Sequence, residues 1–232
     1  MYDVAIVGSG PAGSRAALNL ANLGHNVVVF EKHHSLSDAV RCTGVISSDC
    51  FEQTGVDEDV ILGSSSGASF YSPSGSRLAL ENPKVNILIV DQKAMEIRMV
   101  ERAAKAGAEF NFGWAASDVE ITSEYVTLTV SQNNTRRQVR ARSVIFASGF
   151  RSRLPQRLGL GINGDFVIGG QVELGNLGVE EVEVYVGSRF APGFFGWALP
   201  TYPGQAMVGV LARRNPRPHL EARQRNRKEQ AK

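Results

Sequence analysis

The residues with the clearest chemical pattern are three glycines near the start of the chain, Gly8, Gly10 and Gly13. This spacing is typical of a pyrophosphate-binding turn: Gly8 permits a tight turn, Gly10 lets phosphates approach the backbone, and Gly13 lets a helix pack closely on a sheet. Pro11 suits the first helical turn, where its missing N–H removes no hydrogen bond. The backbone around Pro11 and Ala12 is therefore predicted to bind an anion at a helix N-terminus.

An acidic residue, Glu31, follows 18 residues after Gly13. Its carboxylate can accept hydrogen bonds from ribose hydroxyls, and its charge disfavours a 2′-phosphate. The elements that must position these residues are a strand over residues 4–7, a helix ending near Gly24 and a second strand over residues 27–31. The pattern predicts a dinucleotide-binding βαβ unit. A glycine-rich turn in an ordinary α/β unit is the alternative, and it leaves Glu31 unexplained.

A second group of side chains with chemical potential lies beyond a polar loop at residues 32–38. Arg41 could pair with phosphate oxygens at the sheet edge that holds the pyrophosphate, or could be a plain surface arginine. Cys42 could be a reactive thiol or a small buried apolar residue. Lys32, next to Glu31, is also a candidate for contact with the dinucleotide.

The middle of the chain changes to a period of two. Strands are predicted around residues 110–114, 119–122, 126–130 and 139–142. The next run, residues 143–149, is continuously apolar and ends on Ala147, Ser148 and Gly149. It predicts a buried parallel strand that returns to the first sheet and ends near the cofactor, where small residues permit close approach. A simple strand-to-loop turn is equally compatible with the spacing.

Three aromatic residues stand among glycines and prolines in residues 191–200. This composition is poor for a strand or a helix, so a rigid apolar loop is predicted between strands at 166–172, 181–186 and 206–211. The loop could be a surface for a hydrophobic ligand or a packed turn.

Composition limits the class of protein. The 232 residues are 43% hydrophobic and 21% charged, which is ordinary for a globular chain. Cys42 and Cys50 are the only cysteines, too few for a disulfide framework or a zinc site, and no metal is expected. Since the first strand begins at residue 2 and no apolar run reaches about 18 residues, we expect neither a signal peptide nor a membrane span, and a cytoplasmic location.

The charge is unevenly distributed. Residues 213–232 carry eight Lys or Arg and two Glu, so this tail has a net charge of +6 and the preceding body −4. A solvated, disordered end is the plainer interpretation, and contact with nucleic acid or anionic lipid is the other. We expect no nucleic-acid partner.

With these motifs established, the chain resembles the geranylgeranyl reductase family, flavoproteins with a p-hydroxybenzoate-hydroxylase-like fold. The match runs over residues 1 to about 212. It is most specific in Gly-Ser-Gly-Pro-Ala-Gly-Ser at 8–14, Arg-Cys-Thr-Gly at 41–44 and Phe-Gly-Trp-Ala-Leu-Pro at 195–200. The last segment is similar to the family's Tyr-x-Trp-x-Phe-Pro lipid-cavity motif.

The resemblance implies FAD as the dinucleotide, with NAD(P)H or another reductant as electron donor. It implies reduction of isoprenoid C=C bonds in a lipid or pigment precursor by hydride from reduced flavin. A prenylated substrate in turn implies peripheral contact with a membrane. Arg41 and Cys42 would lie near the flavin, with Cys42 as the catalytic proton donor, and Ala115 and Ala116 near adenine. The residues of the substrate cavity would be Phe195, Trp197 and Pro200.

The implied fold is α/β, a Rossmann-like FAD-binding domain with a mainly parallel sheet and a β-meander, plus a partial antiparallel β-sheet substrate domain. The expected division is 1–62 and 86–158 for the FAD-binding domain, 63–85 and 159–212 for the substrate domain, and 213–232 for the tail.

The chain departs from the family at several positions. Gln92 replaces a frequent arginine, Ser148 replaces an aspartate, and Phe195 replaces the motif's tyrosine. A Gly-Asp-Ala segment that closes over the flavin in relatives is missing, so we expect a C-terminally truncated form of such a reductase. Two alternatives remain. One is a flavoprotein aromatic monooxygenase that uses oxygen and a pyridine nucleotide, and the other is a flavin-binding module or inactive fragment without turnover.

Overall fold

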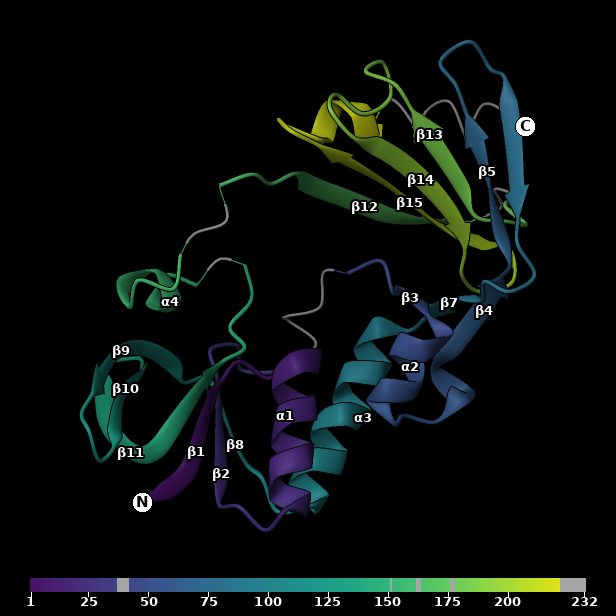
Figure 1. Ribbon diagram of the computed structural model, residues 1–232. Helices are drawn as coiled ribbons and strands as arrows, with labels where there is room; N and C mark the ends of the chain where they lie inside the picture. The colour runs from purple at the N-terminus through teal and green to yellow at the C-terminus, as the bar shows by residue number, and fades with distance from the viewer. Residues whose placement is uncertain (37–41, 151, 162–163, 176–177, 222–232) are drawn as a thin grey trace. The chain divides into compact units, whose positions relative to one another are not determined.

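The computed structural model describes residues 1–36, 42–150, 152–161, 164–175 and 178–221 (Figure 1). The chain forms two compact units, each built from segments that are distant in sequence. The first unit comprises Met1–Arg41, Thr54–Val56 and Gln92–Asn163, and the second comprises Cys42–Gln53, Asp57–Asp91 and Gly164–Lys232.

The first unit contains a six-stranded sheet in the order β8-β2-β1-β11-β10-β9. Its strands are β1 (Tyr2–Val7), β2 (Val27–Glu31), β8 (Glu109–Phe112), β9 (Ala115–Ile121), β10 (Val126–Gln132) and β11 (Thr135–Phe146). Four of them, β8, β2, β1 and β11, pair in parallel, and β11, β10 and β9 form an antiparallel meander. The predicted α/β class, with a mainly parallel sheet and a meander, is confirmed.

Two helices, α1 (Pro11–Asn22) and α3 (Gln92–Lys105), lie side by side against one face of the parallel strands (Figure 1). Ile6 and Val29 point to that face and pack with Ala17 of α1 and Ala103 of α3. The alternate residues of the same strands pack with the meander on the other face. Because both faces are covered, β2 is buried at every position, as expected for a parallel strand.

The strand β11 corrects one prediction. Residues 139–142 and 143–149 were expected to form separate strands, but β11 is a single strand of 12 residues. Its first part pairs antiparallel with β10 across the two-residue turn Asn133–Asn134, and its last part pairs parallel with β1. No turn residue separates the two parts, so the backbone continues from one partner to the other. The predicted return of residues 143–146 to the first sheet is confirmed.

The second unit contains a six-stranded sheet in the order β12-β15-β14-β13-β5-β6 and a three-stranded sheet in the order β3-β7-β4. The large sheet comprises β5 (Gly67–Tyr71), β6 (Arg77–Glu81), β12 (Ile168–Gly175), β13 (Glu183–Val186), β14 (Phe195–Pro200) and β15 (Gln205–Ala212). The small sheet comprises β3 (Val45–Ser47), β4 (Ile61–Ser65) and β7 (Ile87–Val90). Only the β5–β13 pair in the large sheet is parallel. Short helices complete the chain: α2 (Ser48–Thr54), a 3-10 turn at Glu58–Val60, and α4 (Leu154–Arg157) in the first unit.

The prediction of a loop over residues 191–200 is wrong for its second half, which forms the strand β14. The reason is that a large side chain on β14 packs over a glycine on the neighbouring strand β15. Trp197 lies opposite Gly209, and a Cβ at Gly209 would overlap the indole ring. A glycine on the partner strand thus makes room for an aromatic residue that composition alone placed in a loop.

The boundaries of the two units differ from the division expected from the sequence. Residues 42–53, 57–62 and 86–91 belong to the second unit, whereas the sequence division placed them with the FAD-binding part. Residues 159–161 belong to the first unit, whereas the sequence division placed them with the substrate part. The units are defined by contacts, and the function of each remains a prediction. In the tail, residues 217–221 are helical, with an ion pair of 2.8 Å between Arg217 and Glu221, and residues 222–232 lie outside the described part.

Candidate functional site

The glycine turn joins β1 to α1 and has little room for side chains. Gly8 has φ +103°, and a Cβ there would overlap the carbonyl of Ala147, while a Cβ at Gly13 would overlap the carbonyl of Gly8. At Gly10, by contrast, an added Cβ would meet nothing within 4 Å. Two of the glycines therefore allow tight packing of protein on protein, and Gly10 faces open space.

That open space lies at the N-terminus of α1. Gly10 is the N-cap residue and offers no side chain to the first turn, Pro11 is the first helical residue, and Ala12 is exposed. In a helix the first N–H groups have no intrahelical acceptor and carry the positive end of the dipole. This end of α1 therefore suits a phosphate group.

Glu31 ends β2 and is buried, with 7% of its surface exposed. One carboxylate oxygen accepts from the Ser9 N–H at 3.0 Å, and the other accepts from the His33 N–H at 3.0 Å and lies 2.7 Å from His33 Nδ1. Burial alone would raise the pKa of Glu31, but these hydrogen bonds and the nearby His33 ring outweigh it, and the pKa is lowered. Glu31 is thus held as a carboxylate, the form that accepts ribose hydroxyls. The roles of Ser9 and His33 were not predicted.

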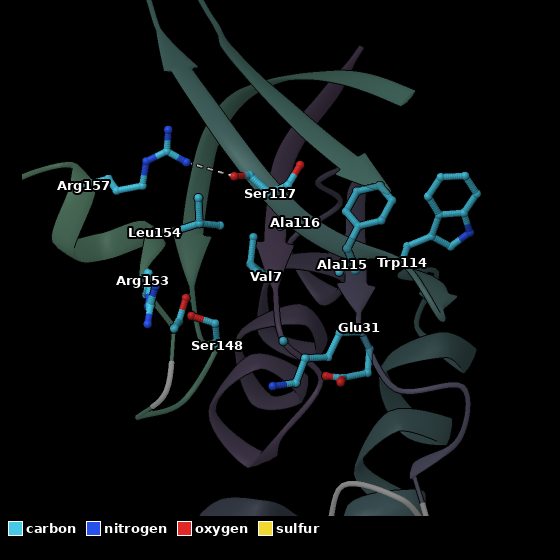
Figure 2. Close-up of a pocket in the computed structure, with 14 residues that line it drawn as sticks. Val7, Glu31, Trp114, Ala115, Ala116, Ser117, Ser148, Arg153, Leu154 and Arg157 are labelled. Carbon is cyan, nitrogen blue, oxygen red and sulfur yellow. Dashed lines mark hydrogen bonds between the residues drawn. The ribbon is translucent and has the colours of Figure 1, made fainter. Parts of the chain in front are cut away.

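Beside Glu31 is a cavity of about 510 Å³ (Figure 2). It lies at the carboxyl ends of β1 and β2, where ligands of open α/β sheets bind. Six predicted cofactor residues line it: Gly8, Glu31, Lys32, Ala115, Ala116 and Ser148. The sequence did not point to the others, which are Val7, Phe30, Trp114, Ser117, Ser152, Arg153, Leu154 and Arg157. The structure therefore brings residues that are expected to contact adenine and ribose into the lining of one cavity.

A second cavity of about 590 Å³ in the same unit reaches the start of α1. Four predicted residues line it: Ala12, Ala147, Ser148 and Gly149. Ser148 and Ser152 line both cavities. The small residues that follow β11 are therefore next to the glycine turn, as the parallel pairing of β1 and β11 requires.

The two residues that were expected near the flavin, Arg41 and Cys42, have a different outcome from the cavity-lining residues. Arg41 lies outside the described residues, and Cys42 belongs to the second unit, where it is exposed. Gln171 on β12 fastens this segment, since its amide Nε2 donates to the Cys42 carbonyl at 3.3 Å and its Oε1 accepts from Thr43 Oγ1 at 3.1 Å. Gly44 follows with φ +75° and its carbonyl accepts from Val90 N–H at 2.8 Å. These two hydrogen bonds could not be predicted from the sequence, because Gln171 is about 130 residues away.

The three predicted cavity residues lie on β14. Trp197 is 8% exposed and packs with Ile89 and Leu199, and in the part of the chain that the structure describes its Nε1 is buried without a hydrogen-bond partner. Phe195 is partly buried, with its ring 4.8 Å from that of Phe194 and 6.3 Å from that of Trp197. Pro200 ends the strand. Trp197 is therefore a core residue of its unit, and its contact with a substrate remains a prediction.

The residues that the structure describes contain no group of three or more His, Cys, Asp or Glu side chains placed to hold a metal ion. Across the same ranges, no helix has the length and hydropathy that a bilayer crossing needs.

Residues 1–231 match the family described as "FAD binding domain". The chain belongs to this family. FAD is its cofactor, as the sequence predicted, and the site fits that molecule: an open helix N-terminus for the diphosphate, a buried carboxylate for the ribose and a cavity for the adenine.

Relatives confirm the resemblance to geranylgeranyl reductases. The chain is 32% identical over 221 residues to digeranylgeranylglycerophospholipid reductase 2 of Methanothermobacter thermautotrophicus, with 92% of this chain and 57% of that protein aligned. A crystal structure of a geranylgeranyl bacteriochlorophyll reductase-like protein from Thermoplasma acidophilum matches with a TM-score of 0.86 and 28% identity. That match covers 97% of this chain and 62% of the other. The chain thus spans little more than half the length of the curated relatives it matches.

A more distant likeness shows the fold alone. The structure of p-nitrophenol 4-monooxygenase from Pseudomonas putida matches with a TM-score of 0.76, covering 98% of this chain and 62% of that one, at 18% identity.

Proposed function

We propose that this chain forms the cofactor-binding part of an FAD-dependent oxidoreductase that reduces isoprenoid C=C bonds in a prenylated lipid or pigment precursor. The cofactor half of the proposal is supported by the site in the first unit, where an open α1 N-terminus, buried Glu31 and an adjoining cavity suit the parts of FAD. The substrate half is supported by the identity of 32% to a digeranylgeranylglycerophospholipid reductase.

Bound and reduced, FAD would supply the hydride. The chain would supply the rest: α1 would hold the diphosphate, Glu31 would orient the ribose, and Ala115 and Ala116 would contact adenine. Cys42 would hold, on its sulfur, the proton that adds to the second alkene carbon, so that the C=C bond gains one hydride and one proton. The assignment to Cys42 comes from the family resemblance, and peripheral contact with a membrane follows from the lipid nature of such a substrate.

The first test is the visible absorption spectrum of the purified chain after addition of FAD and desalting. We expect retained flavin near one per chain, and then oxidation of the reduced flavin when a geranylgeranylated lipid is added without oxygen. A chain that keeps FAD but never transfers electrons to the prenyl substrate would support the flavin-binding module instead. A colourless chain would refute the cofactor site.

The monooxygenase alternative rests on fold likeness at 18% identity, and the same fold hosts several flavin reactions. NADPH and oxygen consumption stimulated by a phenol, with no prenyl reduction, would establish it in place of the reductase.

The role of β14 needs its own variants, because the two aromatic residues differ in burial. Replacing buried Trp197 by Ala should cost about 3–5 kcal/mol of folding stability, which would obscure any effect on substrate. Phe195→Ala is the better test: we expect a higher KM for long prenyl chains with unchanged flavin content. Equal loss of flavin and activity would show that Phe195 is structural.

A further inference from the structure

The helix α4 (Leu154–Arg157) contributes side chains to both cavities described above, the one beside Glu31 and the one at the start of α1. Leu154 and Arg157 line the cavity beside Glu31, while Pro155 and Gln156 line the one at the start of α1. The position of this single helical turn therefore affects the shape of both cavities.

One turn of helix is not stable by itself in water, so contacts with the rest of the unit must hold it. Leu154 supplies one contact, since only 6% of its surface is exposed. Arg157 supplies two: its Nη1 donates to the Ser117 carbonyl at 3.1 Å, and its Nη2 lies 3.3 Å from Asp118 Oδ1 (Figure 2 shows the first). Both partners lie on β9, directly after Ala116, so Arg157 fastens α4 to the strand that is expected to contact adenine.

We propose that Arg157 is a positioning residue for the adenosine half of FAD. By joining α4 to β9, Arg157 keeps Leu154 in the cavity that Val7 and Ala116 also line. Apolar side chains in these positions can pack against the flat faces of adenine. Its guanidinium bonds protein groups and is not assigned to phosphate. The inference deepens the cofactor assignment and rests on the placing of adenosine in this cavity, but it does not depend on reductase activity.

The size of the effect follows from the exposure of the pair. The side chains of Arg157 and Asp118 are 61% and 49% exposed, so the ion pair itself contributes little. The hydrogen bond from a charged donor to the Ser117 carbonyl adds to it. We therefore expect a three- to tenfold loss of affinity when both are removed, roughly the effect of one such contact.

The test compares Arg157→Gln and Asp118→Asn with a matched control, Arg142→Gln. Arg142 also makes an exposed ion pair in the first unit, with Asp3 at 3.9 Å, and lines neither cavity. Dissociation constants are measured for FAD, and for ADP and adenosine in competition with FAD, after thermal melting has shown that each variant is folded. We expect Arg157→Gln to weaken all three ligands by the same three- to tenfold factor. Asp118→Asn should weaken them less, Arg157→Lys should restore part of the affinity, and the control should stay within about twofold.

An equal loss of affinity for FAD, ADP and adenosine distinguishes a positioning role of Arg157 from direct binding of phosphate. If ADP weakens and adenosine does not, Arg157 contacts phosphate directly and the proposal is wrong. If every ligand binds Arg157→Gln as it binds the unmodified chain, α4 needs no fastening and the proposal is again wrong, while the cofactor assignment stands. If the unmodified chain binds none of the three, the cofactor assignment fails and takes this inference with it.

Discussion

Replacing Gly10 by Val should weaken FAD binding strongly and leave the fold intact, because this glycine alone of the three in the turn faces open space. Its φ of −63° and ψ of 179° are accessible to any residue, and an added Cβ meets no protein atom within 4 Å. The substitution at an N-cap position should cost about 1 kcal/mol of folding stability.

The cost to FAD is larger. A valine side chain would occupy the space through which a diphosphate reaches the first N–H groups of α1. Each hydrogen bond to a charged group contributes about 1.5–3 kcal/mol, so the loss of two corresponds to about 3–6 kcal/mol, or roughly a 10²- to 10⁴-fold weaker Kd.

The assay is FAD titration followed by the flavin absorbance, with thermal melting to compare stability. Gly175→Val is the matched control, since Gly175 lies in the second unit and an added Cβ there also meets nothing within 4 Å. Gly8→Val should fail to fold, because a Cβ at Gly8 overlaps the Ala147 carbonyl. A folded Gly10→Val chain whose Kd for FAD is within about threefold of the original would refute the reasoning.

Three further predictions concern charge and anchoring. The pKa of Glu31 is lowered in the folded chain, so its stabilising contribution is present above the ordinary value of 4.5 and is lost as pH falls through the folded pKa. In urea unfolding at several pH values, the free energy of unfolding of Glu31→Gln should therefore fall less steeply in acid than that of the unmodified chain. Burial and the nearby Glu31 charge raise the pKa of Glu96, despite a hydrogen bond from Gln92, so ionised Glu96 lowers stability above pH 4.5. Glu96→Gln should therefore raise the free energy of unfolding at pH 7 but not at pH 4, and an equal gain at both pH values would contradict this. Gln171→Leu removes both hydrogen bonds to the segment that carries Cys42, so a maleimide should modify the Cys42 thiol about two- to tenfold faster in a Cys50→Ser background. An unchanged rate would show that these two hydrogen bonds do not restrain the segment.

Sequence alone determined the cofactor turn, because the physics there is local. The tight turn at Gly8, the proline that begins α1 and the acid that ends β2 are all set within 31 consecutive residues. The alternation of apolar residues likewise predicted strands in the meander, since a half-buried strand imposes a period of two.

The tertiary structure decided whatever depends on partners distant in the chain. Residues 195–200 form a strand because Gly209 of β15 accommodates Trp197, which no local pattern reveals. Arg157 reaches Ser117 across 40 residues, and both contacts depend on how the backbone brings those segments together. Local sequence specifies local backbone geometry, whereas burial, cavity walls and long-range hydrogen bonds exist only after the chain has packed, and for this reason they had to be found in the structure.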